Sequence, residues 1–265
     1  MADYILGLLL SLFAGLATAV GSLLAISVKE FKKKYLTLAL GVSGGVMVYI
    51  SFMELMPHAV SVIGDLYAVI CLFVGFIVMF IVDVLIPEQD NPHQFDNINY
   101  GDKHLLLDEE KRTARESQLK RAVLMAALAI GIHNFPEGIA TFVATLENPQ
   151  WGIMIAIAVA IHNIPEGIAV SMPILYATKD KKKAFLIGLY SGIAEPIGAV
   201  LAFLVLMPII TPQILAGIMA LIAGIMIYIS VDEIIPVAHS YNEGHWAIVG
   251  FMIGMMIMAV TLLVL

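Results

Sequence analysis

The sequence predicts an all-α polytopic membrane protein whose eight spanning helices follow a 3+2+3 arrangement. Three observations lead to this prediction: the composition is strongly apolar, long apolar segments recur along the chain, and two sets of motifs repeat. The chain has 265 residues, of which 60% are hydrophobic and only 13% charged, and its mean hydropathy is +0.94. These values exclude an ordinary soluble domain.

A membrane-crossing helix needs about 20 consecutive, mostly apolar residues, and eight segments meet this requirement. They cover residues 4–28, 36–58, 66–87, 121–146, 150–177, 184–207, 213–239 and 246–265. We therefore interpret 1–265 as a single transmembrane domain, with 88–118 as a cytoplasmic loop between spans 3 and 4. The first apolar segment lacks the basic start and cleavage site of a secretory signal, so we interpret it as mature sequence. The single cysteine, Cys71, excludes a disulfide framework or a thiolate metal cage within the chain.

The basic residues predict the orientation of the chain, because lysine and arginine gather in cytoplasmic loops. All fourteen lie in three segments, 29–34, 103–121 and 179–183, which connect spans 1–2, 3–4 and 5–6. Alternating spans place these connections on one side, so both termini are predicted to be external in a multi-pass protein of the cell membrane. The net charge of −7 says little about partners, and we expect contacts with membrane lipid and none with nucleic acid.

Spans 1–3 are predicted to be repeated as spans 6–8. Residues 44–60 align without gaps on 223–239, with eight of seventeen positions identical, including the string Tyr-Ile-Ser followed by Glu and Pro. The segment 15–21 in span 1 similarly aligns on 192–198 in span 6. Because two spans intervene, the copies have opposite topology, as in many secondary transporters. Spans 4 and 5 form a further antiparallel pair between them.

The most informative motif occurs twice, as His-Asn-Phe-Pro-Glu-Gly-Ile-Ala at 133–140 and as His-Asn-Ile-Pro-Glu-Gly-Ile-Ala at 162–169. A carboxylate at the centre of a bilayer costs roughly 2.5 to 3.5 kcal/mol, so a spanning helix usually turns it toward a partner or a cavity. Histidine and glutamate four residues apart share one helical face. The two motifs therefore predict a metal site near the membrane midplane.

Other residues extend the predicted site. Pro136 and Pro165 remove helical amides and should leave the Ile132 and Ile161 carbonyls without helical partners at the same depth. In span 6, Glu195 is followed by Pro196 and reaches that depth as well. Three carboxylates and two imidazoles without a thiolate suit Zn²⁺, Fe²⁺, Mn²⁺ or Co²⁺.

Acidic residues also lie near both ends of the predicted path. The repeated segment places Glu54 near the external end of span 2, and Asp232 with Glu233 near the cytoplasmic end of span 7. We interpret these three as contacts of an ion that enters or leaves. For His58 and His239 an interfacial role is favoured. His93 and His104 are interpreted as part of a solvated loop.

With these motifs the chain resembles the ZIP (Zrt- and Irt-like) family of metal-ion transporters, and most closely its bacterial branch of zinc and broad divalent-metal uptake. The resemblance rests on the two His-Asn-x-Pro-Glu-Gly motifs and on Gly-Ile-Ala-Glu-Pro in span 6, and it extends over nearly the whole chain. It implies that metal moves from outside into the cytoplasm, with no cofactor besides the transported ion. It also makes a homodimer plausible.

Carried onto this chain, the resemblance implies two adjoining ion sites bridged by Glu137 and Glu166. The residues of the first are His133, Glu137, His162 and Glu166, and those of the second are Asn134, Asn163 and Glu195. Some members of the family carry an acidic residue where Asn163 stands, so the occupancy of the second site stays open.

Two alternatives use the same residues. One is an intramembrane di-metal enzyme, although the chain has no His-Glu-x-x-His motif and its His-x-x-x-Glu spacing differs from the Glu-x-x-His of di-iron bundles. The other is a metal-selective channel, which differs from a carrier by non-saturating flux. The ligands do not rank the metals, since geometry and availability decide among similar ions.

Overall fold

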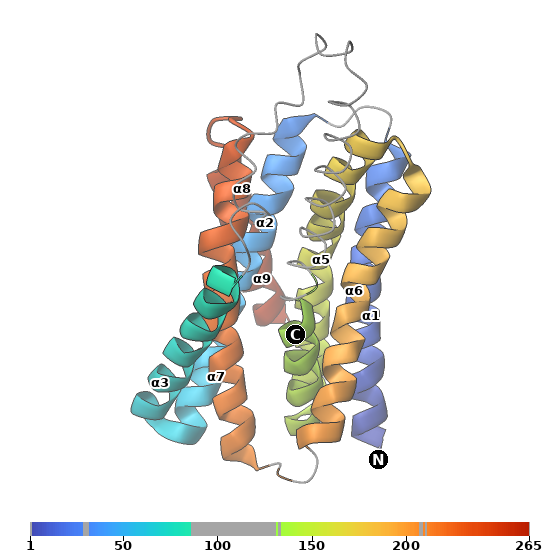
Figure 1. Ribbon diagram of the computed structural model, residues 1–265. Helices are drawn as coiled ribbons and strands as arrows, with labels where there is room; N and C mark the ends of the chain where they lie inside the picture. The colour runs from blue at the N-terminus through green and yellow to red at the C-terminus, as the bar shows by residue number, and fades with distance from the viewer. Residues whose placement is uncertain are drawn as a thin grey trace, which may run out of the picture.

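A computed structural model describes residues 2–28, 32–85, 131, 134–206, 209 and 211–264, and within these ranges the chain is helical with short connections (Figure 1). The helices are α1 (Ala2–Ser27), α2 (Lys33–Ile50), η1 (Ser51–Leu55), α3 (Met56–Leu85), α5 (Pro149–Thr178), α6 (Lys181–Leu206), α7 (Pro212–Ile229), η3 (Ser230–Ile234), α8 (Ile235–Ser240) and α9 (Trp246–Val264). Residues 134–147 form a further helical stretch. The predicted loop 88–118 and the first half of span 4 lie outside the described residues.

Six runs within the described residues are long and apolar enough to cross a membrane. One of them, Lys33–Leu85, contains predicted span 2 and all but the last two residues of predicted span 3. Gly64 divides it, because this residue has φ of 78° and ψ of 162°, which interrupts the helix within α3. Beyond this glycine the ribbon turns back along the bundle (Figure 1). The prediction of an all-α membrane protein is confirmed.

The helices pack as two groups. In the first, α1 contacts α5 and α6, and α5 contacts α6. In the second, α2 packs on α9, and α3 packs on α7. The first group stands on the right in Figure 1, with α2, α3, α7 and α8 on the left. The principal direct contact between the groups is made by α2 against α5.

Glycines allow the helices of the first group to approach closely. A methyl group on Gly15 would overlap the Gly192 carbonyl, and one on Gly192 would overlap the Gly15 carbonyl. Two further contacts involve residues at equivalent positions of the repeated segments. Gly167 of α5 lies against the Thr18 carbonyl of α1, just as Gly138 lies against the Glu195 carbonyl of α6. Thus α5 packs on α1 as the 134–147 helix packs on α6.

The second group shows the same correspondence. Gly45 of α2 lies against the Phe251 carbonyl of α9, and Gly224 of α7 lies against the Leu72 carbonyl of α3. These two contacts involve positions that the alignment of the predicted repeats makes equivalent. Small residues that bring backbones together are typical of membrane helix interfaces.

A π-helical turn occurs at the same aligned position in both halves of the second group. These turns are η1 and η3, and each begins with a serine whose hydroxyl donates to a carbonyl four residues earlier, Ser51 to Met47 and Ser230 to Met226, both at 2.8 Å. The turns carry Glu54 in one copy and Asp232 with Glu233 in the other. Such single π turns within α-helices are frequent at functional sites.

Large apolar side chains cover the outer faces of the bundle. On α3, Leu66, Phe73 and Phe80 are more than half exposed, as are Met252 and Met256 on α9. In water such continuous apolar surface would be costly, whereas lipid tails accept it.

Candidate metal centre

The repeated motifs meet in the interior of the bundle. Glu137, His162 and Glu166 each offer a ligand atom, and these atoms lie within 4.8 Å of one another. All three side chains are buried, with at most 3% of their surface exposed. The cluster joins two elements, the 134–147 helix and α5. A histidine and two carboxylates at this spacing form a ligand set suited to Zn²⁺ or a similar divalent ion.

The histidine is held in a metal-binding tautomer. His162 Nδ1 lies 3.2 Å from the Ala158 carbonyl oxygen, which can only accept, so Nδ1 donates. In the neutral ring Nε2 then carries the lone pair, and this atom faces Glu137 Oε1 at 3.1 Å. Two acceptors at that distance need a shared proton or a cation between them. A backbone partner on the other ring nitrogen is the usual arrangement of a metal-ligating histidine.

A serine from the second helix group orients the other carboxylate. Ser43 of α2 donates from its Oγ to Glu166 Oε1 at 3.0 Å, and both side chains are buried. Ser43 was not predicted as a site residue from the sequence. Its only signal was a position next to Gly44 and Gly45 in the motif-bearing span. This hydrogen bond crosses from α2 to α5, so it connects the site to the helix group that does not carry the ligands.

The asparagine of the second motif holds a third carboxylate. Asn163 Nδ2 donates to the Ala14 carbonyl of α1 at 2.9 Å and also to Glu195 Oε1 of α6. The Glu195 carboxylate lies within electrostatic range of Glu137 and Glu166. Asn134, the equivalent asparagine of the first motif, donates from Nδ2 to the Ser191 carbonyl at 3.4 Å. All of these polar side chains are fully buried.

Four buried oxygens of this region have no hydrogen-bond partner within the described residues. They are Glu137 Oε2, Asn134 Oδ1, Asn163 Oδ1 and Glu195 Oε2. A buried polar atom without a partner costs about 1–3 kcal/mol. All four are acceptors, so a cation or a hydrogen-bond donor satisfies them. These amide and carboxylate oxygens therefore fit as ligands of a divalent ion beside the histidine cluster.

Helix ends and helix contacts set the depth of the ligands. Asn148 begins α5, and its Oδ1 accepts from the Gln150 and Trp151 amides at 2.8 and 3.3 Å, with Pro149 at the first helical position. At 1.5 Å per residue, His162 lies about 20 Å beyond this cap and about 24 Å before Thr178. It is thus close to the middle of a bilayer-spanning helix.

Proline modifies α5 at the same level. The helix runs continuously from Pro149 to Thr178 through Pro165, which has no N–H to donate, so the Ile161 carbonyl loses its helical partner beside the ligands. Within the span this carbonyl requires water, an ion or another donor. The counterpart predicted for the first motif, the carbonyl of Ile132, lies outside the described residues, as does His133.

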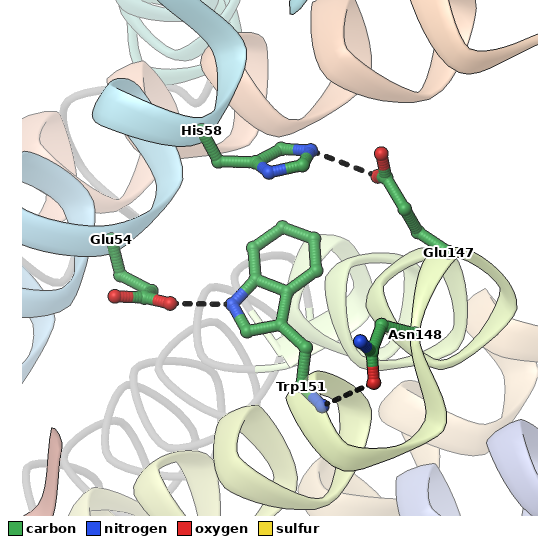
Figure 2. Close-up of a pocket in the computed structure, with 5 residues that line it drawn as sticks. All are labelled: Glu54, His58, Glu147, Asn148 and Trp151. Carbon is green, nitrogen blue, oxygen red and sulfur yellow. Dashed lines mark hydrogen bonds and ion pairs between the residues drawn. The ribbon is translucent and has the colours of Figure 1, made fainter. Parts of the chain in front are cut away.

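The remaining predicted residues do not join this cluster. Asp232 is exposed and Glu233 is partly exposed on η3. This turn leads into α8, which lies at the end of the bundle where α2 begins (Figure 1). Glu54 of η1 lies instead in a pocket with His58, Glu147, Asn148 and Trp151 (Figure 2). This pocket is at the opposite end, where α5 begins. His58, which was interpreted as interfacial, is partly exposed there, and its Nε2 lies 2.9 Å from Glu147 Oε2.

Comparison with known proteins identifies similar chains. The family described as "ZIP Zinc transporter" matches residues 86–262. The protein called zinc transporter ZupT of Chlorobaculum parvum is 47% identical over 262 residues, covering 96% of this chain and 95% of its own. The ZupT of Oceanobacillus iheyensis is 46% identical over 273 residues, covering both chains fully. The ZupT of Chlorobium chlorochromatii is 45% identical over 262 residues, with 96% and 95% covered.

Proposed function

The chain belongs to the ZIP family of zinc transporters, and from this premise we propose that its buried His–Glu cluster is the transport site. The protein is an integral membrane transporter for divalent metal ions, with Zn²⁺ as the expected principal substrate. The metal is cargo, and the family assigns no enzymatic reaction to the chain. The di-metal enzyme considered from the sequence is therefore set aside.

One observation carries the assignment of the site. The lone-pair nitrogen of His162 and carboxylate oxygens of Glu137 and Glu166 converge within 4.8 Å in a fully buried place. Without a cation, two carboxylates and an imidazole in such a place oppose one another and lack solvation. A divalent ion offsets both costs, because it supplies the positive charge and accepts the lone pairs. His133, four residues before Glu137, is proposed as a further ligand of this ion.

The oxygens of Asn134, Asn163 and Glu195 are proposed to bind a second ion beside the first. Support comes from the unpartnered acceptors of these three residues and from the remaining oxygen of Glu137. Glu137 and Glu166 would then bridge the two ions, as the family resemblance implies. This oxygen-rich half is expected to bind more weakly than the half that contains histidine, because imidazole is a better zinc ligand than an amide oxygen.

We further propose eight spans in a 3+2+3 inverted repeat, with both termini external and import into the cytoplasm. The paired glycine contacts and the paired π turns support the repeat, because equivalent positions make equivalent contacts in both halves. The division of Lys33–Leu85 at Gly64 supports two spans in that run. The lysines of 29–34 and 179–183 support a cytoplasmic location for the α1–α2 and α5–α6 connections.

Alternating access is proposed to arise from movement of the α1, α5 and α6 group against the α2, α3, α7 and α9 group. The ligands lie on helices of the first group, and the hydrogen bond from Ser43 to Glu166 joins the two groups. Glu54 and the pair Asp232 and Glu233 lie at opposite ends of the second group and are proposed as first and last contacts of the ion. The exposed apolar faces of α3 and α9 are proposed to contact lipid or a second copy of the chain.

Purified protein in liposomes that contain a zinc-sensitive dye tests the function. We expect external Zn²⁺ to give a dye signal whose initial rate saturates with concentration, because the buried site must bind each ion before it crosses. No organic substrate should be required. Protein-free liposomes and liposomes with heat-denatured protein are the controls. Flux that rises linearly to millimolar Zn²⁺ would support the channel alternative, and absence of flux would contradict the proposed function.

A further inference from the structure

A second group of metal-ligating side chains lies at the end of the bundle opposite the Lys-rich connections. Glu54, His58, Glu147, Asn148 and Trp151 line a pocket of about 330 Å³ (Figure 2). The residues that the structure describes around this pocket include two carboxylates and an imidazole but no lysine or arginine. The side chains of His58 and Glu147 are 24% and 21% exposed, so an ion can reach them from water.

Two polar contacts cross this pocket from one helix group to the other. His58 Nε2 lies 2.9 Å from Glu147 Oε2, and the Trp151 indole N–H donates to Glu54 Oε1 at 2.7 Å. Glu54 and His58 come from η1 and α3, whereas Glu147 ends the 134–147 helix and Trp151 lies in the first turn of α5. Figure 2 shows the indole between Glu54 and the His58–Glu147 pair.

The His58 ring is held in place for ligation. Its centroid lies 4.3 Å from that of the Trp151 ring, with an interplanar angle of 40°. His58 also stands four residues after Glu54, so both side chains project from one face across the junction of η1 and α3. Their carboxylate and imidazole enter the same pocket (Figure 2). The spacing is the reverse of the His-x-x-x-Glu motifs that form the buried cluster.

His58 and Glu147 need only a small movement to hold an ion, whereas Glu54 has farther to move, because among the described residues only the buried cluster brings three such ligand atoms within 4.8 Å. Two ligand atoms at about 2.1 Å from a tetrahedral zinc ion are about 3.4 Å apart. His58 Nε2 and Glu147 Oε2, now 2.9 Å apart, would separate by about half an ångström to receive it. Glu54 reaches the same ion only by releasing the Trp151 indole, because its Oε1 is occupied by that hydrogen bond.

We propose that His58, Glu147 and Glu54 form a second divalent-cation site, which captures Zn²⁺ at the outer mouth and displaces the Trp151 indole as it fills. Two carboxylates and a neutral imidazole match the charge and ligand preference of Zn²⁺. Because the indole contact joins the two helix groups, binding of the ion removes one of the links that hold the groups together at this end. The ion would thus favour opening of the mouth it enters.

This inference deepens the proposed function, since it assigns the first contact of the transported ion, but it can be measured without transport. The chain has two tryptophans, so Trp246→Phe leaves Trp151 as the only one. We expect Zn²⁺ to change the Trp151 emission in detergent-solubilised Trp246→Phe protein, and the change to saturate. In this background His58→Ala and Glu147→Gln should each raise the apparent Kd at least tenfold.

Two controls distinguish this site from the buried one. Glu137→Gln in the same background should retain the emission change, whether or not it transports zinc. His245→Ala removes an exposed histidine at the other end of the bundle and should leave the apparent Kd unchanged. Circular dichroism and gel filtration show which variants are folded, and either His58→Ala or Glu147→Gln alone suffices for the test. The proposal is overturned by an absent emission change, by one that Glu137→Gln abolishes, or by one that a folded pocket variant leaves unaltered.

Discussion

Glu137→Gln should reduce zinc uptake by about 100-fold or more while leaving the protein folded. Even partners of metal ligands contribute 10–100-fold to metal affinity or activity, and Glu137 is proposed as a ligand itself. Its Oε1 faces His162 Nε2 at 3.1 Å and its Oε2 has no other partner among the described residues. Glutamine keeps the shape but loses the charge that attracts the ion. His162→Ala should cause a loss of similar size.

Initial rates of zinc uptake into proteoliposomes, at equal amounts of reconstituted protein, measure this effect. Glu243→Gln is the matched control, because it removes a carboxylate from the connection between α8 and α9, far along the chain from the ligands. This control should retain the rate of the unmodified protein. Near-normal uptake by both Glu137→Gln and His162→Ala would show that zinc crosses without the buried cluster.

Gly167→Ala should lower the thermal stability of the protein and also its transport. A methyl group there would overlap the Thr18 carbonyl and come within 3.0 Å of the Ser22 amide nitrogen, both backbone atoms of α1. Overpacking of this kind typically costs about 1–3 kcal/mol, which corresponds to a decrease in Tm of about 2–10 °C for a chain of this size. Because Gly167 follows Glu166, separation of α5 from α1 would also displace a ligand.

Gly217→Ala provides the comparison for this substitution. Its methyl group would meet only Cys71 Sγ, at an ordinary contact distance of 3.7 Å, and alanine is favoured over glycine in a helix by about 1 kcal/mol. We therefore expect Gly217→Ala to leave the Tm unchanged or raise it. Thermal unfolding of both variants in one detergent measures the difference. Equal Tm values for the two variants would contradict the packing of α5 on α1 described above.

The elements of the site were predictable because membrane burial makes polar residues conspicuous. Two identical His–Glu spacings within apolar segments predicted a metal site, and the structure brings Glu137, His162 and Glu166 together from those segments. Membership of the ZIP family confirms the resemblance inferred from the motifs. The glycines that follow the two motif glutamates, Gly138 and Gly167, both lie against a carbonyl of a neighbouring helix.

The partners of the ligands were not predictable, because they come from helices distant in sequence. Ser43 reaches Glu166 across 123 positions, and a single serine in a glycine-rich span gives no periodic signal. The outer pocket was missed for the same reason. Periodicity places Glu54 and His58 on one helical face, but only the packing of α5 against α2 places Glu147 and Trp151 opposite them.

The pattern of apolar residues was also insufficient to predict where each helix ends. The single run from Lys33 to Leu85 is apolar enough over part of its length to cross a membrane, and its division depends on the backbone of one residue, Gly64. The sequence predicted two spans there from length alone. The π turns η1 and η3 carried no recognised signal, although both fall within the repeated Tyr-Ile-Ser segment. In hindsight, a serine before an acidic residue in that repeat coincides with each turn.

Diffraction data collected on both sides of the zinc absorption edge, from crystals of the zinc-loaded protein, test whether the buried cluster binds zinc. We expect an anomalous difference peak bounded by His162 Nε2 and by carboxylate oxygens of Glu137 and Glu166, with bonds of about 2.0–2.2 Å. The peak should vanish in His162→Ala crystals grown under the same conditions. A zinc peak within the membrane-spanning region that touches none of these three side chains would contradict this expectation.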